Sequence, residues 1–246
     1  MNRKERVAAS FAAAADTYES AAEAQIRAGE ILARRVLATP LPPAPRVLEI
    51  GCGTGLLTRR LLPQLGGSWI VTDIAPAMVA AADRALPGRA IYRVMDGECP
   101  DVAVGSRDLI VSNLAAQWFG DLPGALARLA RCLAPGGRLM LTTLGAGSFA
   151  EWRQAHDRLV LASGTAAYPT AVALRAMLPQ ACVLAEAVPV RYADGRAFVR
   201  ALKTIGAGTP ASGHQPLTAG AMRRVLAELG APATFTYEVL TVDLSI

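Results

Sequence analysis

The chain has 246 residues, of which 52% are hydrophobic and 18% charged, and its formal net charge is +5. This composition is typical of an ordered protein with one large buried core and excludes a disordered chain. No apolar run approaches the roughly 18 residues that a membrane span requires, and acidic residues interrupt the alanine-rich start. We therefore expect a cytoplasmic protein without a membrane span, signal peptide or transit peptide.

The basic residues and the cysteines exclude further classes of protein. The arginines are dispersed and form no dense basic run, so a nucleic-acid-binding surface is not expected. The four cysteines form no Cys-x-x-Cys pair and have no histidine at ligand spacing. Neither a metal site nor a disulfide framework is therefore expected.

Residues 1–38 are expected to be helical, because good helix formers carry apolar residues at helical spacings without a proline. Four prolines between residues 40 and 45 then end this arm. From residue 46 short apolar runs alternate with helical segments, the clearest helix being 122–133 before the Pro135-Gly136-Gly137 turn. The alternation predicts a doubly wound α/β fold with a mostly parallel sheet. Its first strands are expected at Val47–Ile50, Trp69–Thr72, Ala90–Val94, Leu109–Ser112 and Arg138–Thr143.

The last hundred residues are expected to cover one end of this sheet. Residues 145–180 are interpreted as an inserted helical segment that is broken by its glycines and Pro169. Strands are expected at Val183–Tyr192 and Thr234–Leu244, with helices near 194–205 and 218–229. No repeat or low-complexity linker divides the chain. We expect a single domain over residues 1–246, made of a helical arm (1–40), a cofactor-binding core (46–144) and a helical cover with the last strands (145–246).

A glycine-rich turn, Glu49-Ile50-Gly51-Cys52-Gly53-Thr54-Gly55, follows the first expected strand. Its glycines allow tight turning and close approach of a ligand to the backbone. A dinucleotide fingerprint would need a glycine at position 56, where Leu56 stands, so a nicotinamide-dependent oxidoreductase is the less favoured reading. The carboxylate of Glu49 suits the ammonium of S-adenosylmethionine. A plain strand–helix turn remains the structural alternative for this loop alone.

Acidic residues also close the next two strands. Asp73 ends the second strand, where its carboxylate could accept both ribose hydroxyls of a nucleoside, and Asp96 follows the third, where it could accept from an adenine amino group. A lone acid after a strand usually caps a turn or a helix. Three acids in register after three successive strands favour a nucleoside cofactor at the open end of the sheet.

These motifs together resemble the class I S-adenosylmethionine-dependent methyltransferases, which have a Rossmann-like, seven-stranded sheet. Further segments are similar to the malonyl-acyl-carrier-protein O-methyltransferases of biotin synthesis, and the likeness covers nearly the whole chain. They are Phe11 to Gln25, Ser112 to Trp118, Leu202 to Ala207, Pro216 to Thr218 and Phe235 to Glu238, beside the Met95-Asp96-Gly97-Glu98 motif. Ala12, Ala13 and Ala75 depart from that family's pattern, which puts arm closure and one cofactor hydrogen bond in doubt.

The resemblance implies transfer of a methyl group from S-adenosylmethionine, with S-adenosylhomocysteine as product, to the free carboxylate of a malonyl thioester. The thioester would be on acidic acyl carrier protein or on coenzyme A. Carboxyl groups ionise near pH 4, so no general base is required, and His156 and His214 are expected to be structural or exposed. The alternatives are another small carboxylic acid, a quinone-type acceptor, or a non-catalytic protein that keeps the fold for binding.

Candidate site residues follow from these motifs and from the resemblance. Tyr18 is expected to align the acceptor, which should also contact Asn113 and Trp118. Arg200 and Lys203 share one face of the 194–205 helix with Arg196; such a stripe ordinarily faces solvent, but it could bind the substrate carboxylate or the carrier, helped by Arg191. The cofactor is expected to contact Tyr18, Gln25, Glu49, Gly51, Cys52, Gly53, Gly55, Asp73, Ile74, Met78, Asp96, Gly97, Asn113 and Leu114.

Overall fold

A seven-stranded sheet forms the centre of the computed structural model, which describes residues 2–211 and 213–246. The strands lie in the order β3-β2-β1-β4-β5-β7-β6; the first five in the chain are parallel, and β7 is antiparallel to both of its neighbours. Strand order therefore reverses between β1 and β4, where α/β proteins bind their ligands. The bounds are β1 Arg46–Ile50, β2 Ser68–Asp73, β3 Ile91–Val94, β4 Arg107–Asn113, β5 Leu133–Leu144, β6 Cys182–Tyr192 and β7 Ala233–Ser245.

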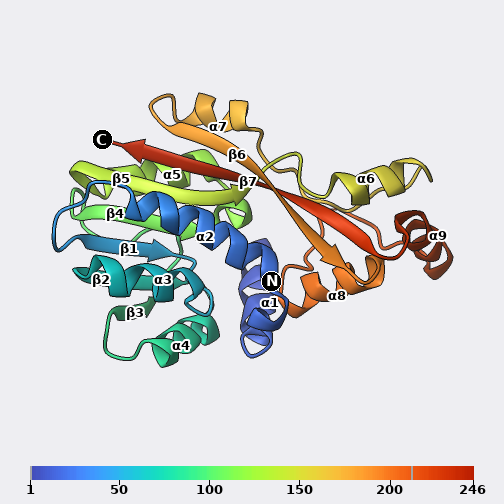
Figure 1. Cartoon of the computed structure of the whole chain (residues 1–246), viewed down its shortest axis with the longest axis horizontal. Coiled ribbons are helices and arrows are strands. Elements are labelled where there is room, and N and C mark those ends of the chain that lie inside the picture. Colours follow the sequence, from blue (N-terminus) through green and yellow to red (C-terminus); the bar gives the residue numbers. More distant parts are fainter. Residues whose placement is uncertain (1, 212) are drawn as a thin grey trace.

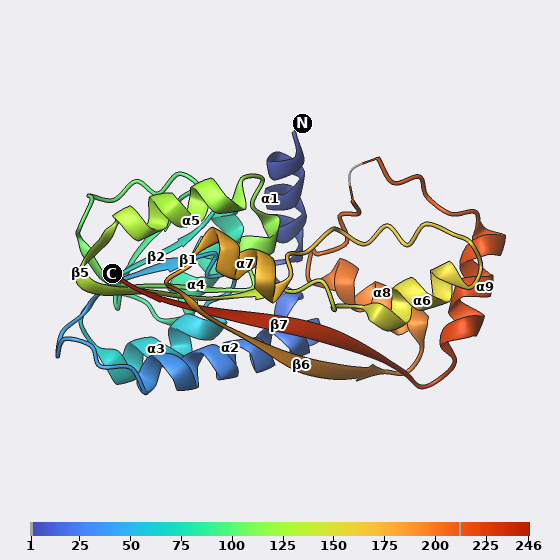
Figure 2. The ribbon, with the colours of Figure 1, turned by 90° about the horizontal axis from the view of Figure 1, so that it is seen from above.

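Helices cover both faces of the sheet. Helices α2 and α3 lie on one face and α5 and α7 on the other (Figure 2), which explains why successive residues of β1 and β4 are buried on both faces of the sheet. The described α-helices are α1 Arg3–Ala14, α2 Glu23–Leu37, α3 Leu56–Leu65, α4 Pro76–Ala85, α5 Leu122–Arg131, α6 Ala150–Asp157, α7 Ala171–Met177, α8 Gly195–Thr204 and α9 Ala219–Leu229, with 3₁₀ turns η1 Tyr18–Ala21 and η2 Ala116–Trp118. None of these is long and apolar enough to cross a membrane.

The last two strands extend beyond the rest of the sheet. Pairing of β5 with β7 stops at Leu144 and Val239, whereas β6 and β7 stay paired as far as Tyr192 and Ala233. This two-stranded extension carries α6, α8 and α9 away from the parallel strands (Figure 1). Helix α1 stands between the two parts (Figure 2), so the arm borders both the sheet edge and the cover.

Two expectations about local structure were wrong in detail. The arm is interrupted: α1 ends at Ala14, and the hydroxyl of Thr17 donates to carbonyls of Ala14 and, across the molecule, Thr204. The Pro135-Gly136-Gly137 segment is not a turn that precedes the strand. It forms an irregular stretch inside β5, where the Gly136 N–H donates to the carbonyl of Ile246. The segment 145–180 is helical and broken as expected: it contains the short helices α6 and α7, which lie on either side of Pro169.

Candidate active site

The turn after β1 depends on its glycines. Gly51, Gly53 and Gly55 have φ angles of +66°, +54° and +87°, a conformation that residues with side chains rarely adopt. A Cβ on Gly51 would lie 2.4 Å from the Cβ of Ala115. Gly51 and Gly53 therefore present bare backbone to a cavity at the switch point, whereas Gly55 starts α3 and lines no part of it.

Asp73 holds this turn from the carboxyl end of β2. One carboxylate oxygen accepts the Gly53 N–H at 3.0 Å and the other accepts the Ala75 N–H at 2.8 Å. Burial raises the pKa of this carboxyl, and the backbone N–H donors oppose the shift. Each oxygen keeps a second lone pair, so the side chain can still accept hydroxyl groups from the cavity that it lines.

Glu49 is 1% exposed and lines a small pocket that continues this cavity at one end, since the two share Tyr18, Gly51, Gly53 and Asn113. The Thr58 hydroxyl donates to its Oε2 at 2.7 Å, but burial outweighs this bond, and with the charge of Asp73 it raises the pKa of Glu49 to about 8. The carboxyl is therefore largely protonated at neutral pH unless a cation lies beside it. The buried Oε1 of Gln25, which lines the same end, has no hydrogen-bond partner among the described residues. A buried acid and an orphaned acceptor fit an ammonium group. The buried thiol of Cys52 lines this end too.

Asp96 lies at the opposite end, with Ile74, Met78 and Gly97 in the same lining. Its carboxylate accepts from the Lys4 Nζ at 2.7 Å and from the Glu98 N–H at 3.0 Å. Lys4 also forms an ion pair with Glu98. The first turn of α1 therefore closes this end of the cavity, and the expected contact of Asp96 with an adenine stays a prediction.

Asn113 joins the arm to the sheet at the end of β4. Its Nδ2 donates to the carbonyl of Gln25 at 3.0 Å, and its Oδ1 accepts from the Thr142 hydroxyl at 2.8 Å. Gly29 in α2 permits this approach, because a Cβ there would lie 3.3 Å from the Asn113 Nδ2. Asn113 lines the cavity as expected, and both ends of its amide also hold the protein together.

A second, larger cavity adjoins the first. Phe11, Tyr18, Leu114 and Trp118 line both, and Tyr18 also lines the Glu49 end. The rings of Phe11 and Trp118 are nearly perpendicular, with centroids 5.4 Å apart. Burial, helped by the charge of Asp73, raises the pKa of Tyr18, so its phenol stays protonated at neutral pH. The structure thus places Tyr18 at the junction of the cavities.

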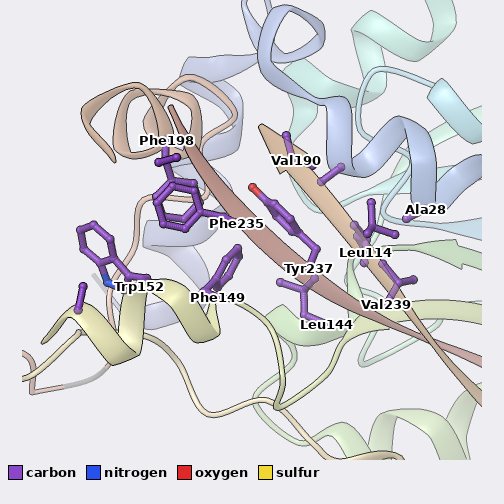
Figure 3. Close-up of a cluster of buried hydrophobic side chains, with 14 of the residues drawn as sticks. Ala28, Leu114, Leu144, Phe149, Trp152, Val190, Phe198, Phe235, Tyr237 and Val239 are labelled. Carbon is purple, nitrogen blue, oxygen red and sulfur yellow. The ribbon is translucent and has the colours of Figure 1, made fainter. Parts of the chain in front are cut away.

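Aromatic side chains from the cover line the far side of the larger cavity. They belong to the cluster of buried side chains that Figure 3 shows. The rings of Phe149 and Tyr237 lie 4.7 Å apart, and Phe198 stacks on Phe235 at 3.8 Å. Tyr237 from the extension of β7 and Phe198 from α8 line the cavity, whereas Phe235 of β7 stacks on Phe198 from outside the lining. The wall is therefore aromatic and mostly apolar, which limits water around anything bound at the junction.

The two cavities differ in charge. The first is lined by the carboxylates of Asp73, Asp96 and Glu98, with Lys4 as the opposing cation. The larger cavity is lined by Arg3 and Lys203 and, within residues 2–211 and 213–246, by no carboxylate. By simple electrostatics the first cavity suits a cation and the second an anion.

The basic stripe of α8 meets only the rim of the larger cavity. Phe198 and Ile205 are buried on one face of the helix, while Arg196, Arg200 and Lys203 are exposed on the other. Lys203 lines the cavity, but Arg200 lines neither cavity. Arg200 is therefore placed to contact a partner at the surface and not an acceptor inside.

The histidines behave differently from one another. His156 is buried, its Nδ1 lies 2.8 Å from the carbonyl of Trp152, and its ring packs on that indole at 4.4 Å, as expected of a structural residue. His214 lines the larger cavity against Gly164. Nothing in the sequence pattern had indicated this position.

Comparison with known proteins places the chain in a family. A methyltransferase domain model matches residues 48–141. The chain is 43% identical over 249 residues to the malonyl-[acyl-carrier protein] O-methyltransferase of Magnetococcus marinus, covering 97% of this chain and 92% of that protein. The chain belongs to the malonyl-[acyl-carrier protein] O-methyltransferase family.

Other relatives of this methyltransferase are longer or more distant. It is 49% identical over 237 residues to the biotin biosynthesis bifunctional protein BioCD of Bordetella avium, covering 94% of this chain but only half of that protein. The YcgJ protein of Bacillus subtilis has the same fold, with a TM-score of 0.63 at 18% identity over 87% of this chain and 97% of that one. The confirmed expectations are the doubly wound α/β fold and the methyltransferase family.

S-adenosylmethionine is the cofactor of this methyltransferase, and the first cavity fits it. The glycine turn leaves room that a Cβ would fill, and the orphaned Gln25 acceptor and buried Glu49 lie at one end. Asp73 in the middle and the Asp96 end complete a lining suited to a cationic nucleoside. When bound, the cofactor supplies an electrophilic methyl group on a positively charged sulfur.

Sequence reasoning missed residues of the arm that close this site. Arg3, Lys4 and Glu19 had no assigned contact, yet Lys4 reaches Asp96, and Glu19 accepts from the Thr54 hydroxyl and from Arg59, each at 2.7 Å. Glu19 was visible within the family-like arm pattern. Lys4 carried no signal, because its partner lies 92 residues away.

Proposed function

We propose that this methyltransferase transfers the methyl group of S-adenosylmethionine to the free carboxylate of a malonyl thioester on acyl carrier protein, as a step of biotin synthesis. The observation that carries the proposal is the charge difference between two adjoining cavities. A carboxylate-lined cavity suits the cationic methyl donor, and a cavity lined by basic and aromatic side chains suits an anionic acceptor. The name of the Magnetococcus relative, a malonyl-[acyl-carrier protein] O-methyltransferase, supports the choice of acceptor.

The reaction requires alignment of the acceptor with the methyl donor and exclusion of water more than it requires proton transfer. A carboxylate is already ionised at neutral pH, so the side chains at the junction need not act as a base. The carboxylate oxygen would attack the methyl carbon, and the electron pair of the carbon–sulfur bond would go to the positive sulfur. Both charges would diminish toward the transition state, which surroundings poor in water favour. Phe11, Leu114 and Trp118 exclude water there, and the protonated phenol of Tyr18 can donate to an acceptor oxygen.

The exposed stripe of Arg196, Arg200 and Lys203 supports the carrier as the source of the thioester. Acyl carrier protein is expected to be acidic, and Lys203 brings this stripe to the rim of the larger cavity. A carrier docked on α8 could deliver its thioester into the cavity. A carrier-bound substrate also agrees with the cytoplasmic location expected from the sequence.

A methyl-transfer assay over a panel of acceptors tests the proposal. The panel contains malonyl-carrier protein, malonyl-coenzyme A, free malonate, other small carboxylic acids and a quinone-type phenol. We expect transfer to the malonyl thioesters, with the carrier-bound form preferred. Equal rates on free acids, or a preference for the phenol, would overturn the assignment while leaving the methyltransferase family untouched.

A further inference from the structure

Arg3 is the half-buried cation of the larger cavity. It lies at the start of α1, and its Nη1 donates to the backbone carbonyl of Trp118 at 3.1 Å. Trp118 is one of the four residues that line both cavities. The guanidinium is therefore tethered to the junction where the methyl acceptor must lie.

The charge of Arg3 is available to a ligand. Its neighbour Lys4 is neutralised by ion pairs with Asp96 and Glu98, but no carboxylate of the described residues pairs with Arg3. One bond to a carbonyl uses only one of the five N–H donors of a guanidinium. The remaining donors form a fork that matches the two oxygens of a carboxylate.

Lys203, the other lysine or arginine in this lining, is placed differently. It is exposed on the basic face of α8 and packs beside Gly208. Its ammonium is a point charge on a flexible stem. Lys203 is thus suited to the carrier at the rim, and Arg3 to the group that enters the cavity.

We propose that Arg3 recognises the free carboxylate of the acyl thioester and so determines which thioesters this methyltransferase accepts. This inference rests on the proposed function and adds the residue that binds the charged group of the acceptor. Methylation converts the carboxylate to an uncharged ester, which can no longer form an ion pair with the guanidinium. The contact that selects the substrate therefore also favours release of the product.

The test compares a charged and an uncharged thioester. Dissociation constants of malonyl- and acetyl-carrier protein are measured by calorimetry with S-adenosylhomocysteine bound, so that no turnover occurs. We expect the wild type to bind the malonyl form more tightly by about 10- to 100-fold, the range of a charge-assisted hydrogen-bonded pair. Arg3→Gln should lose most of this preference without weakening the acetyl form, and Arg3→Lys should keep part of it.

Two controls separate recognition from a structural role. S-adenosylhomocysteine affinity of Arg3→Gln should equal that of the wild type, which shows that α1 still closes the cofactor cavity. Arg34→Gln, which removes an exposed arginine of α2 outside the cavities, should keep the full preference. An unchanged malonyl preference in Arg3→Gln, or an equal loss for malonyl and acetyl forms, would overturn the role of Arg3. The wild-type methyl-transfer assay fails only if the proposed function itself is wrong.

Discussion

Glu49 is the residue whose ionisation depends most on what binds beside it. Burial keeps its carboxyl protonated in the ligand-free protein at neutral pH, since its pKa is raised to about 8. An ammonium group placed next to it would favour the charged form and lower that pKa. Binding of the cofactor or of its product should therefore be coupled to loss of a proton from this side chain.

The affinity for S-adenosylhomocysteine should consequently rise as pH rises toward about 8 and level off above it. Calorimetry in two buffers of different ionisation enthalpy should show proton release at pH near 7. Glu49→Gln should bind more weakly and lose both the rise and the proton release. A wild-type affinity that is independent of pH would contradict the anchoring role of Glu49.

The raised pKa of Glu49 also makes the free energy of unfolding depend on pH. The folded-state pKa of about 8 lies above the ordinary value of 4.5, so the unfolded chain ionises first as pH rises. The ligand-free wild type should therefore lose stability between about pH 4.5 and 8. Glu49→Gln should remove this part of the decline, as seen in thermal melts across that range. A steeper decline in the variant would show that the carboxyl is charged in the folded protein.

A substitution at Gly51 tests whether the cofactor turn needs a residue without a side chain. Gly51→Ala combines a φ of +66° with a contact of 2.4 Å to Ala115, so it should destabilise the fold by about 1–3 kcal/mol and abolish cofactor binding. Gly88→Ala is the matched control, because Gly88 has a φ of +69° but nothing within 4 Å of an added Cβ. Urea denaturation and S-adenosylhomocysteine titration should show the larger loss only at Gly51; equal losses would mean that backbone strain alone matters.

Among the elements, η1 connects the arm to the glycine turn. Glu19 accepts hydrogen bonds from Thr54 in the turn and Arg59 in α3. Although burial opposes it, these bonds hold the pKa of Glu19 below its usual range. The carboxylate is therefore charged at neutral pH and fixes Tyr18, its neighbour, over the cavities.

Glu19→Ala should weaken S-adenosylhomocysteine binding roughly tenfold, because hydrogen bonds to a charged group contribute about 1.5–3 kcal/mol and part of that contribution is retained by water. Glu30→Ala removes a comparable exposed ion pair, with Arg60, that joins α2 and α3 away from the turn. Its effect on binding should be close to none. Should both variants bind equally well, η1 would have no part in holding the cofactor site.

Most elements of the sheet could be predicted from the sequence, because strands covered on both faces are continuous apolar runs ended by glycine or acidic residues. β1 and β2 begin and end within a residue or so of their expected bounds. The break in the arm could not be predicted, since it depends on a contact between Thr17 and the distant Thr204. The irregular start of β5 likewise depends on Ile246 at the far end of the chain.

In the candidate site too, residues on the sheet could be predicted from the sequence, and residues placed by distant contacts could not. Glu49, Gly51 and Asp73 could be predicted because parallel strands bring their carboxyl ends to one edge of the sheet. Arg3 and Lys4 could not, since the position of α1 over that edge is set by tertiary packing alone. That the chain folds as a single domain with the expected internal boundaries stays a prediction.

On the scale of the whole molecule, charge is divided between a carboxylate-lined cofactor cavity and a basic acceptor side. If the stripe on α8 guides an acidic carrier, Arg200→Glu should raise the KM for malonyl-carrier protein about tenfold at low salt, and salt should reduce this difference. The KM for malonyl-coenzyme A should change far less. Arg158→Glu, which alters an exposed arginine at the end of α6, serves as the control. Equal effects of both variants would remove the stripe from carrier binding.

The proposed reaction transfers a methyl group from S-adenosylmethionine to the carboxylate of a malonyl thioester at the junction of these cavities. Incubation of the wild type with malonyl-carrier protein and a donor carrying an isotope-labelled methyl group tests it most directly, with the position of the label read by NMR. We expect the label in a methyl ester at the malonyl carboxyl, and no labelled ester with Asp73→Asn. Label at any other atom of the acceptor, or no transfer by the wild type, would contradict it.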